Sequence, residues 1–174
     1  MKRGPALEVA LAMIVVLASV LFFGSLAIHA REKARLATCQ STVKMTAWAL
    51  RAYAHDWDDC LPPAGMVAEV QRRYVHKSGN YIERCPDDHT RQETSYAMPE
   101  VWSGRKFGPL EHRRGVIVLY KADHGVPAYR HGGGINVAYV DGRARWRAEE
   151  TLPREAITRG TDPDPDAPQG KPQR

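Results

Sequence analysis

The sequence predicts an α+β fold in which one long N-terminal helix packs against a small antiparallel sheet, followed by a disordered C-terminal tail. Three observations support this prediction. An uncharged run begins at Val9, and a helix-compatible pattern continues from it to Trp57. A β-hairpin pattern lies near residue 141, and beyond Thr151 the chain is rich in proline and poor in apolar residues. The expected organisation is a leader at 1–4, a helix at 5–57, a head at 58–150 and a tail at 151–174.

Composition limits the function classes. The head is large enough for one small hydrophobic core. The formal charge is +5, but lysine and arginine are scattered among acidic residues along the chain. A nucleic-acid-binding surface would need basic residues gathered on one face. We therefore expect no nucleic-acid partner.

The run from Val9 to Ile28 has 20 residues and no charge. As a helix it would cross the ~30 Å hydrocarbon core of a membrane, so the lipid bilayer is an expected partner. Lys2 and Arg3 precede it, which favours a cytoplasmic N-terminus with the head on the other side. A secretory signal peptide has a shorter apolar region of about 7–15 residues and a small-residue cleavage site. The segment 25–27 offers such a site, so removal remains an alternative, but the length favours a single-pass anchor.

The helical pattern continues beyond the apolar run. After a charged collar, apolar residues recur at steps of three and four, as on one face of a helix. No glycine or proline lies between Gly24 and Leu61. The prolines at 62 and 63 then end the helix, because the residue before a proline is pushed out of the α region. The apolar stripe, which we expect to pack on the head, comprises Leu36, Cys39, Val43, Ala47, Leu50, Ala54 and Trp57.

The hairpin is the best-specified element of the head. Apolar and polar positions alternate before Asp141-Gly142, a pair that is favoured in a two-residue turn. Such a turn places Tyr139 opposite Ala144 and Val137 opposite Trp146. One face of the sheet would then carry Ile135, Val137, Tyr139, Ala144 and Trp146, and the other Asn136, Arg143 and Arg145. A buried strand is also expected at 115–120, a short strand at 95–98 and a short helix at 66–74.

Three separated stretches resemble one family, the bacterial prepilin-like proteins, which include type IV pilins and type II secretion pseudopilins. His131, nine residues and then Asp141-Gly142 match the H-X9-DG motif that names one subgroup. The run from Ala30 to Pro63 looks like the family's charged collar, cysteine, amphipathic helix and prolines. The segments CPDD at 85–88 and SYAM at 95–98 are similar to two further family motifs.

The resemblance implies a pilin-like fold and a non-enzymatic function. The chain would be a structural subunit of a type IV pilus or type II secretion-like filament. It would be anchored in the bacterial cytoplasmic membrane, with its head in the periplasm or outside the cell. Its partners would be other pilin-like subunits, contacted through the N-terminal helix, and a prepilin peptidase.

Family members are cleaved after the glycine of a basic leader and then methylated at the new N-terminus. A glutamate at the fifth mature position neutralises the amine of a neighbouring subunit. Here the cleavage would fall between Gly4 and Pro5, and Glu8, at the fourth mature position, would take the assembly role. A carboxylate in lipid is costly unless it is paired. The alternative is that Glu8 lies at the membrane interface near Lys2 and Arg3.

The three cysteines are Cys39, Cys60 and Cys85. Three cysteines permit one disulfide and one free thiol, and three pairings are open. The resemblance favours a Cys39–Cys85 bridge, because both cysteines lie in family-like segments, and it leaves Cys60 as the free thiol.

Metal binding and catalysis have weaker support in the sequence. Asp123, His131 and Asp141 lie near strand ends and have side chains that ligate zinc or calcium, and some pseudopilins bind Ca²⁺ in this part of the fold. They lack ligand spacing, however, so we expect structural roles and no cofactor. Glycines 132–134 are expected to permit close approach of the backbone to the core helix. No G-x-S-x-G motif is present, and no catalytic residue is assigned.

Two other functions remain open. The first is a membrane-anchored extracytoplasmic module that binds a metal or a glycan near His131 and has no assembly role. The second is a small secreted enzyme whose signal peptide is removed.

Overall fold

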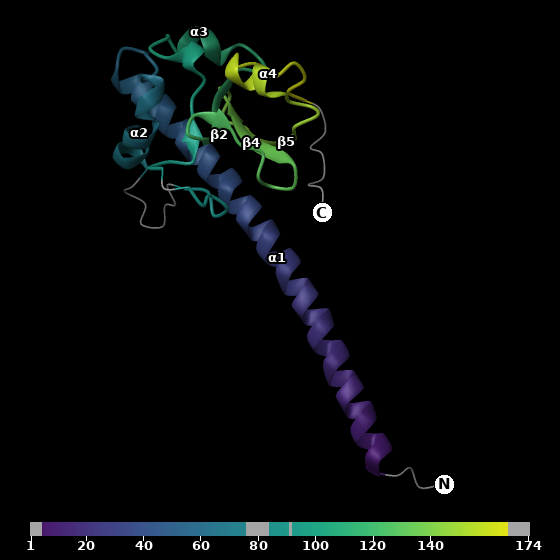
Figure 1. Ribbon diagram of the computed structural model, residues 1–174. Coiled ribbons are helices and arrows are strands. Elements are labelled where there is room, and N and C mark those ends of the chain that lie inside the picture. The colour runs from purple at the N-terminus through teal and green to yellow at the C-terminus, as the bar shows by residue number, and fades with distance from the viewer. Residues whose placement is uncertain (1–4, 76–83, 91, 167–174) are drawn as a thin grey trace. The chain divides into compact units, whose positions relative to one another are not determined.

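The computed structural model describes residues 5–75, 84–90 and 92–166, with side chains from Val9 onward (Figure 1). The described chain is α+β, as the sequence predicts. Its elements in chain order are α1 (Pro5–Asp56), η1 (Ala64–Met66), α2 (Val67–Tyr74), β1 (Tyr96–Ala97), η3 (Glu100–Trp102), α3 (Gly108–Glu111), β2 (Ile117–Asp123), β3 (Val126–Pro127), β4 (Gly134–Tyr139), β5 (Ala144–Ala148) and α4 (Arg154–Thr158).

The chain divides into two compact units, Met1–Arg35 and Leu36–Arg174. The described part of the first unit is helix throughout. Its large apolar side chains are exposed, from Val9 at 64 % to Ile28 at 59 %. By length and composition α1 could cross a membrane. We call the segment from Val9 to Ile28 the apolar segment.

In the second unit, the remainder of α1 forms one wall of the hydrophobic core. Cys39, Val43 and Leu50 are fully buried and belong to the same core cluster as Val118 and Leu119 of β2. The predicted stripe is therefore correct for this part of the helix. Trp57 is the exception, because α1 ends one residue before it and its side chain is 48 % exposed.

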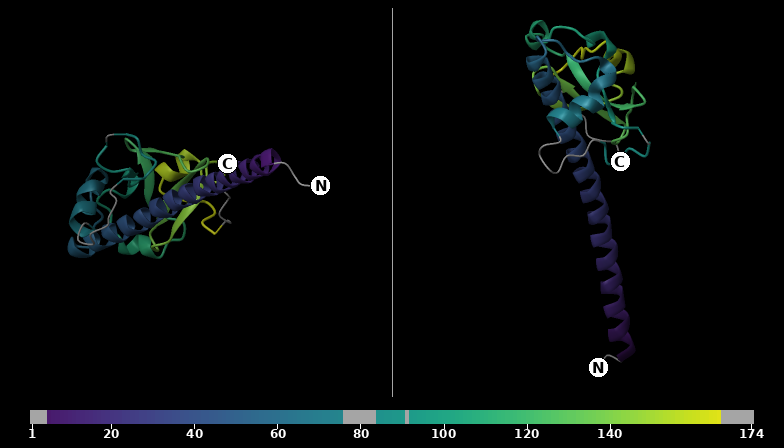
Figure 2. Two further views of the ribbon diagram at one scale, coloured as in Figure 1. Left: turned by 90° about the horizontal axis from the view of Figure 1, so that it is seen from below. Right: turned by 90° about the vertical axis from the view of Figure 1, so that its left-hand side faces the viewer.

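The sheet is antiparallel, with strand order β1-β2-β4-β5 and with β3 paired to the end of β2. Strands β2, β4 and β5 are labelled in Figure 1, and Figure 2 gives two further views of the ribbon. The register between β2 and β4 shifts between Ile117 and Leu119. Such a bulge lets two consecutive residues face the same side. Val118 and Leu119 accordingly both belong to the core cluster that contains α1, whereas Ile117 and Tyr120 belong to the cluster on the other face.

The predicted register of the β4–β5 hairpin is wrong by one residue. Val137 pairs with Arg145, and not with Trp146. Gly142 has a φ of +82°, whereas Asp141 does not have a positive φ, so the two-residue turn that needs both is not formed. The loop has three residues and ends in a left-handed glycine, a common hairpin form that also suits Asp-Gly. The shift moves Ala144 and Trp146 away from the face of Val137 and brings Arg145 and Arg147 onto it.

Both faces of the sheet are covered, which corrects the prediction of a disordered tail from Thr151. Residues 151–166 are described and fold against the sheet, whereas 167–174 lie outside the described residues. Leu152 and Ile157 are fully buried and pack with Ile135 and Val137. Proline-rich composition concealed these apolar anchors. We call residues 152–162 the C-terminal strap.

A buried ion pair attaches the strap to the sheet. Arg147 of β5 is 3.3 Å from an oxygen of Asp162, and both side chains are almost fully buried. The Tyr139 hydroxyl donates a hydrogen bond of 2.5 Å to the same carboxylate. Asp162 also donates through its backbone N–H to the carbonyl of Gly115, 2.7 Å away, beside the start of β2.

Glycines 132–134, at the start of β4, make room for a side chain of the sheet and not for the predicted core helix. A Cβ added at Gly134 would lie 2.1 Å from the indole ring of Trp146. Gly132 and Gly133 have positive φ values of 61° and 74°, which glycine adopts without steric cost. The run of glycines therefore shapes the loop and lets Trp146 pack directly on the backbone.

Candidate functional site

The structure gathers one side chain from each of the three family-like stretches. Cys39 comes from α1, Cys85 from the loop before β1, and His131 from the loop before β4. Their sulfur and nitrogen atoms all lie within 4.8 Å of one another, and all three residues are buried. The sulfur of Cys85 is 3.2 Å from Nε2 of His131. We call these three residues the Cys–His cluster.

Neighbouring groups fix the orientation of His131. Its Nδ1 lies 2.8 Å from a carboxylate oxygen of Asp87. Its carbonyl oxygen accepts a hydrogen bond of 2.8 Å from Nε1 of Trp146. An Nδ1–H bonded to Asp87 leaves Nε2 as the atom presented to Cys85. Asp87 and Trp146 thus hold the ring in the position that the cluster needs.

The loop that carries Cys85 is organised around Asp88. The Asp88 carboxylate accepts hydrogen bonds from the Ser95 hydroxyl and from the backbone N–H of Thr90, the latter at 2.8 Å. It also forms an ion pair of 2.8 Å with Arg130. Ser95 in turn accepts a hydrogen bond of 2.9 Å from the backbone N–H of Cys85. Arg130, which precedes His131, and Ser95, which precedes β1, therefore fix the position of Cys85 together.

Hydrogen bonding holds the pKa of Asp88 well below its ordinary value. Burial acts in the opposite direction, because it disfavours the ionised carboxylate. The donors Ser95, Thr90 and Gln92 outweigh it. The loop conformation is therefore tied to an ionised Asp88.

The two cysteines of the cluster are electrostatically unequal. A hydrogen bond from Cys39 lowers the pKa of Cys85, and the same contact together with burial raises the pKa of Cys39. The positive charge of Lys121, which is fully buried, favours the thiolate form of both sulfurs. The Tyr96 hydroxyl also donates to the sulfur of Cys39, at 3.6 Å. The cluster thus favours negative charge on the sulfur of Cys85 and disfavours it on that of Cys39.

All three cysteines are free thiols in the structure. The predicted Cys39–Cys85 bridge is thus not formed there, although its two partners are neighbours. Cys60 is half-buried and lies outside the cluster. The pairing stays a prediction for oxidising conditions.

The other residues predicted for a site lie elsewhere. Asp141 binds Arg143 within its own turn, at 2.7 Å. Asp123 forms an ion pair of 2.8 Å with Arg130. Neither aspartate belongs to the group of His131 and the two cysteines. Gly4 lies outside the described residues, and the description of Pro5 and Glu8 is limited to the backbone.

Comparisons of the chain with protein-family models, curated proteins and solved structures give no match. Function is therefore argued from the residues. Asp87, His131 and Cys85 stand in the order of an acid, base and nucleophile. A nucleophile needs access to its substrate, however, and Cys85 and His131 are only 3 % and 6 % exposed. The arrangement suits a closed structural centre better than a catalytic one.

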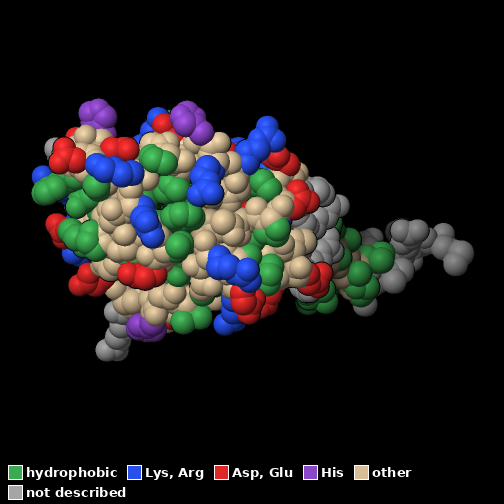
Figure 3. All heavy atoms as spheres, turned by 90° about the horizontal axis from the view of Figure 1, so that it is seen from above, with side chains coloured by type: hydrophobic (Ala, Val, Ile, Leu, Met, Phe, Trp, Pro, Cys, Tyr) green, Lys and Arg blue, Asp and Glu red, His purple; other side chains and the backbone are tan. Residues whose placement is uncertain are grey.

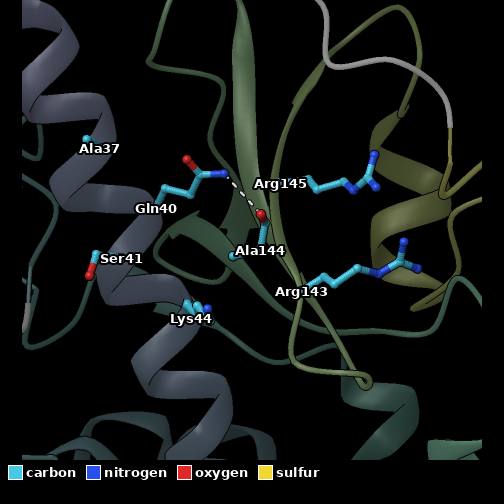
Figure 4. Close-up of a pocket in the computed structure, with 7 residues that line it drawn as sticks. All are labelled: Ala37, Gln40, Ser41, Lys44, Arg143, Ala144 and Arg145. Atoms are coloured by element: carbon cyan, nitrogen blue, oxygen red, sulfur yellow. Dashed lines mark hydrogen bonds between the residues drawn. The ribbon is translucent and has the colours of Figure 1, made fainter.

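A groove beside α1 is a weaker candidate for a functional site than the Cys–His cluster (Figure 4). It is lined on one side by Gln40 and Lys44 and on the other by Arg143 and Arg145. Nε2 of Gln40 donates to the carbonyl of Ala144 across it, at 3.0 Å. Arg143 is already bound by acidic neighbours. The face of the head in Figure 3 likewise intersperses acidic and basic side chains without a block of one sign.

Proposed function

We propose that the protein is a membrane-anchored structural subunit of a pilin-like filament, of the type IV pilus or type II secretion kind. The observation that carries this proposal is that the two halves of α1 differ in the exposure of their apolar side chains. Its apolar segment exposes every large hydrophobic side chain that it has, whereas its second half is built into the core of a head. One helix thus supplies both a membrane segment and the spine of an α+β domain.

Exposed apolar side chains in such number need a non-aqueous environment. Contiguous apolar surfaces of this kind mark membrane or protein contacts. The apolar segment has the length of one membrane crossing. The charged collar that follows would lie at the membrane surface and comprises Arg31, Glu32, Lys33 and Arg35. In lipid, helices associate by close packing of their surfaces. Side-by-side packing of these segments would stack the heads into a filament.

The proposed processing is tested by intact mass. Full-length chain is co-expressed with a prepilin peptidase, and the membrane-extracted protein should lack residues 1–4 and carry one methyl group. A Gly4→Arg variant should keep its leader, because the bond to be cleaved follows that glycine. A wild type that keeps its leader would disprove the processed form of the proposal and leave an unprocessed anchor.

The proposed assembly is tested inside the membrane. A photo-crosslinking amino acid in place of Leu17 should give a ladder of covalent oligomers on illumination. The ladder should persist when the lipid-to-protein ratio is raised, since chance encounters fall with dilution. Adding Glu8→Gln should weaken it if that carboxylate pairs with a neighbouring chain. Monomers with lipid adducts alone would refute assembly through the helix.

A membrane-anchored metal-binding module is the second candidate. The clustering of Cys39, Cys85 and His131 favours it. The two functions are compatible, because the cluster belongs to the head and the proposed assembly uses the apolar segment.

A further inference from the structure

We infer that Cys39, Cys85 and His131 form a binding site for a zinc ion, in which the two sulfurs and Nε2 of His131 are ligands. The inference does not depend on filament assembly. It rests on the ligand atoms, on the groups that orient them, and on a buried ammonium that has no hydrogen-bond partner.

The ligand atoms have the types and spacing that zinc needs. Zinc takes cysteine sulfur at ~2.3 Å and histidine nitrogen at ~2.0 Å in a tetrahedron, which places neighbouring ligand atoms roughly 3.5–3.8 Å apart. The three atoms here lie within 4.8 Å of one another, with 3.2 Å between Cys85 and His131. Small side-chain movements would complete the geometry. Two sulfurs and one imidazole select zinc over the oxygen-seeking calcium.

His131 has the kind of hydrogen-bond partner that is usual for a histidine ligand at a metal site. Zinc-bound histidines donate their second ring N–H to a carboxylate or carbonyl, which fixes the ring and strengthens the ligand. Asp87 holds this position, 2.8 Å from Nδ1 of His131. The loop built on Asp88 in turn holds Asp87 and Cys85 next to each other.

Two buried groups near the sulfurs also favour thiolate ligands over a disulfide. The ammonium of Lys121 is fully buried and has no hydrogen-bond partner. A zinc-bound thiolate would offer it a negative acceptor, whereas a disulfide carries no charge. Asn136 is likewise fully buried, and its side-chain amide lies beside the sulfur of Cys39. Its amide oxygen or a water molecule is available for the fourth position on zinc.

The site would join three distant parts of the chain. Cys39 lies on α1, Cys85 on the loop before β1, and His131 at the entry to β4. A closed zinc centre contributes directly to folding. Here it would attach the spine helix to the loops that precede β1 and β4 without using a disulfide.

The test uses the full-length chain, extracted in detergent without added reductant. Elemental analysis should find one zinc per chain. Replacement by Co²⁺ should give the intense visible bands of a tetrahedral centre and a thiolate charge-transfer band. Cys85→Ser should lose both signals. Cys60→Ser is the matched control and should keep them, because Cys60 lies outside the cluster.

A variant of the carboxylate that holds His131 provides a separate test if a ligand variant does not fold. Asp87→Asn retains all three ligands and should weaken Zn²⁺ binding by about 10–100-fold, measured by competition with a chromogenic chelator. Circular dichroism checks folding. A wild type isolated with a Cys39–Cys85 disulfide, or one that binds Zn²⁺ no better than Cys85→Ser, would overturn the inference. Equal Zn²⁺ affinity of Asp87→Asn and wild type would overturn it as well.

Discussion

The buried ion pair between Arg147 and Asp162 allows a quantitative prediction. Asp162→Ala removes the carboxylate that faces Arg147 and accepts from the Tyr139 hydroxyl. Arg147, whose side chain is only 1 % exposed, would then lose this ion pair. Breaking a buried pair on one side costs about 3–5 kcal/mol in the free energy of unfolding. That is a large share of the roughly 5–15 kcal/mol available to a domain.

Urea unfolding of the full-length chain in detergent measures this cost. Trp102 and Trp146 are buried in the head, so their fluorescence reports its unfolding. The double variant Arg147→Met/Asp162→Ala should recover much of the loss, because it also removes the buried charge of Arg147. Asp166→Ala is the matched control and should change the midpoint little, because its ion pairs with Arg143 and Arg114 are exposed. The reasoning fails if Asp162→Ala costs less than about 1 kcal/mol or if the double variant is no more stable.

Three further predictions concern the head and use the same unfolding assay. Gly134→Ala should destabilise by about 1–3 kcal/mol, since the new methyl group overlaps the ring of Trp146; unchanged stability would contradict the direct packing. Ile157→Ala should cost about 2–5 kcal/mol, because the side chain is fully buried in the strap, whereas an unstructured tail would lose nothing. Asp88→Asn should lower the free energy of unfolding at neutral pH and make that free energy fall less steeply as the solution is acidified. Because the pKa of Asp88 is depressed in the folded state, its carboxylate stabilises the fold at pH values above the ordinary pKa of 3.8, and this contribution is lost as the pH falls through the folded-state pKa. The same loss of stability with falling pH in both proteins would refute this.

Local patterns in the sequence predict much of the fold. The stripe from Cys39 to Ala54 identifies the buried face of α1, because helical periodicity depends on neighbours three and four residues apart. The strand near Ile117 is recognisable because it is a short, continuous apolar run. These predictions need no knowledge of the rest of the chain.

The errors arise where one local pattern is compatible with two structures. Asp141-Gly142 suits a two-residue turn and also a three-residue loop, and the choice decides on which face of the sheet each side chain of β5 lies. The strap contains few apolar residues, so composition indicates disorder. Leu152 and Ile157 become anchors only against the second face of the sheet. That face could not be recognised as buried from β4 alone.

The candidate site illustrates the limit for tertiary contacts. Cys39, Cys85 and His131 each lie in a stretch that resembles the prepilin-like family, but nothing in their spacing along the chain indicates a shared site. No sequence pattern indicates that Asp87 and Lys121 lie beside these three residues. Asp87 belongs to the CPDD segment, so that motif was the one available indication.

The position of the strap has a consequence for biogenesis. If the head is translocated across a membrane as proposed, the apolar segment, which is synthesised first, enters the bilayer long before Asp162 leaves the translocation channel. Until then the ion pair between Arg147 and Asp162 cannot form, and the second face of the sheet is uncovered. The head would therefore mature late, after the anchor is in place, and during that interval it would depend on chaperones or on membrane proximity for protection.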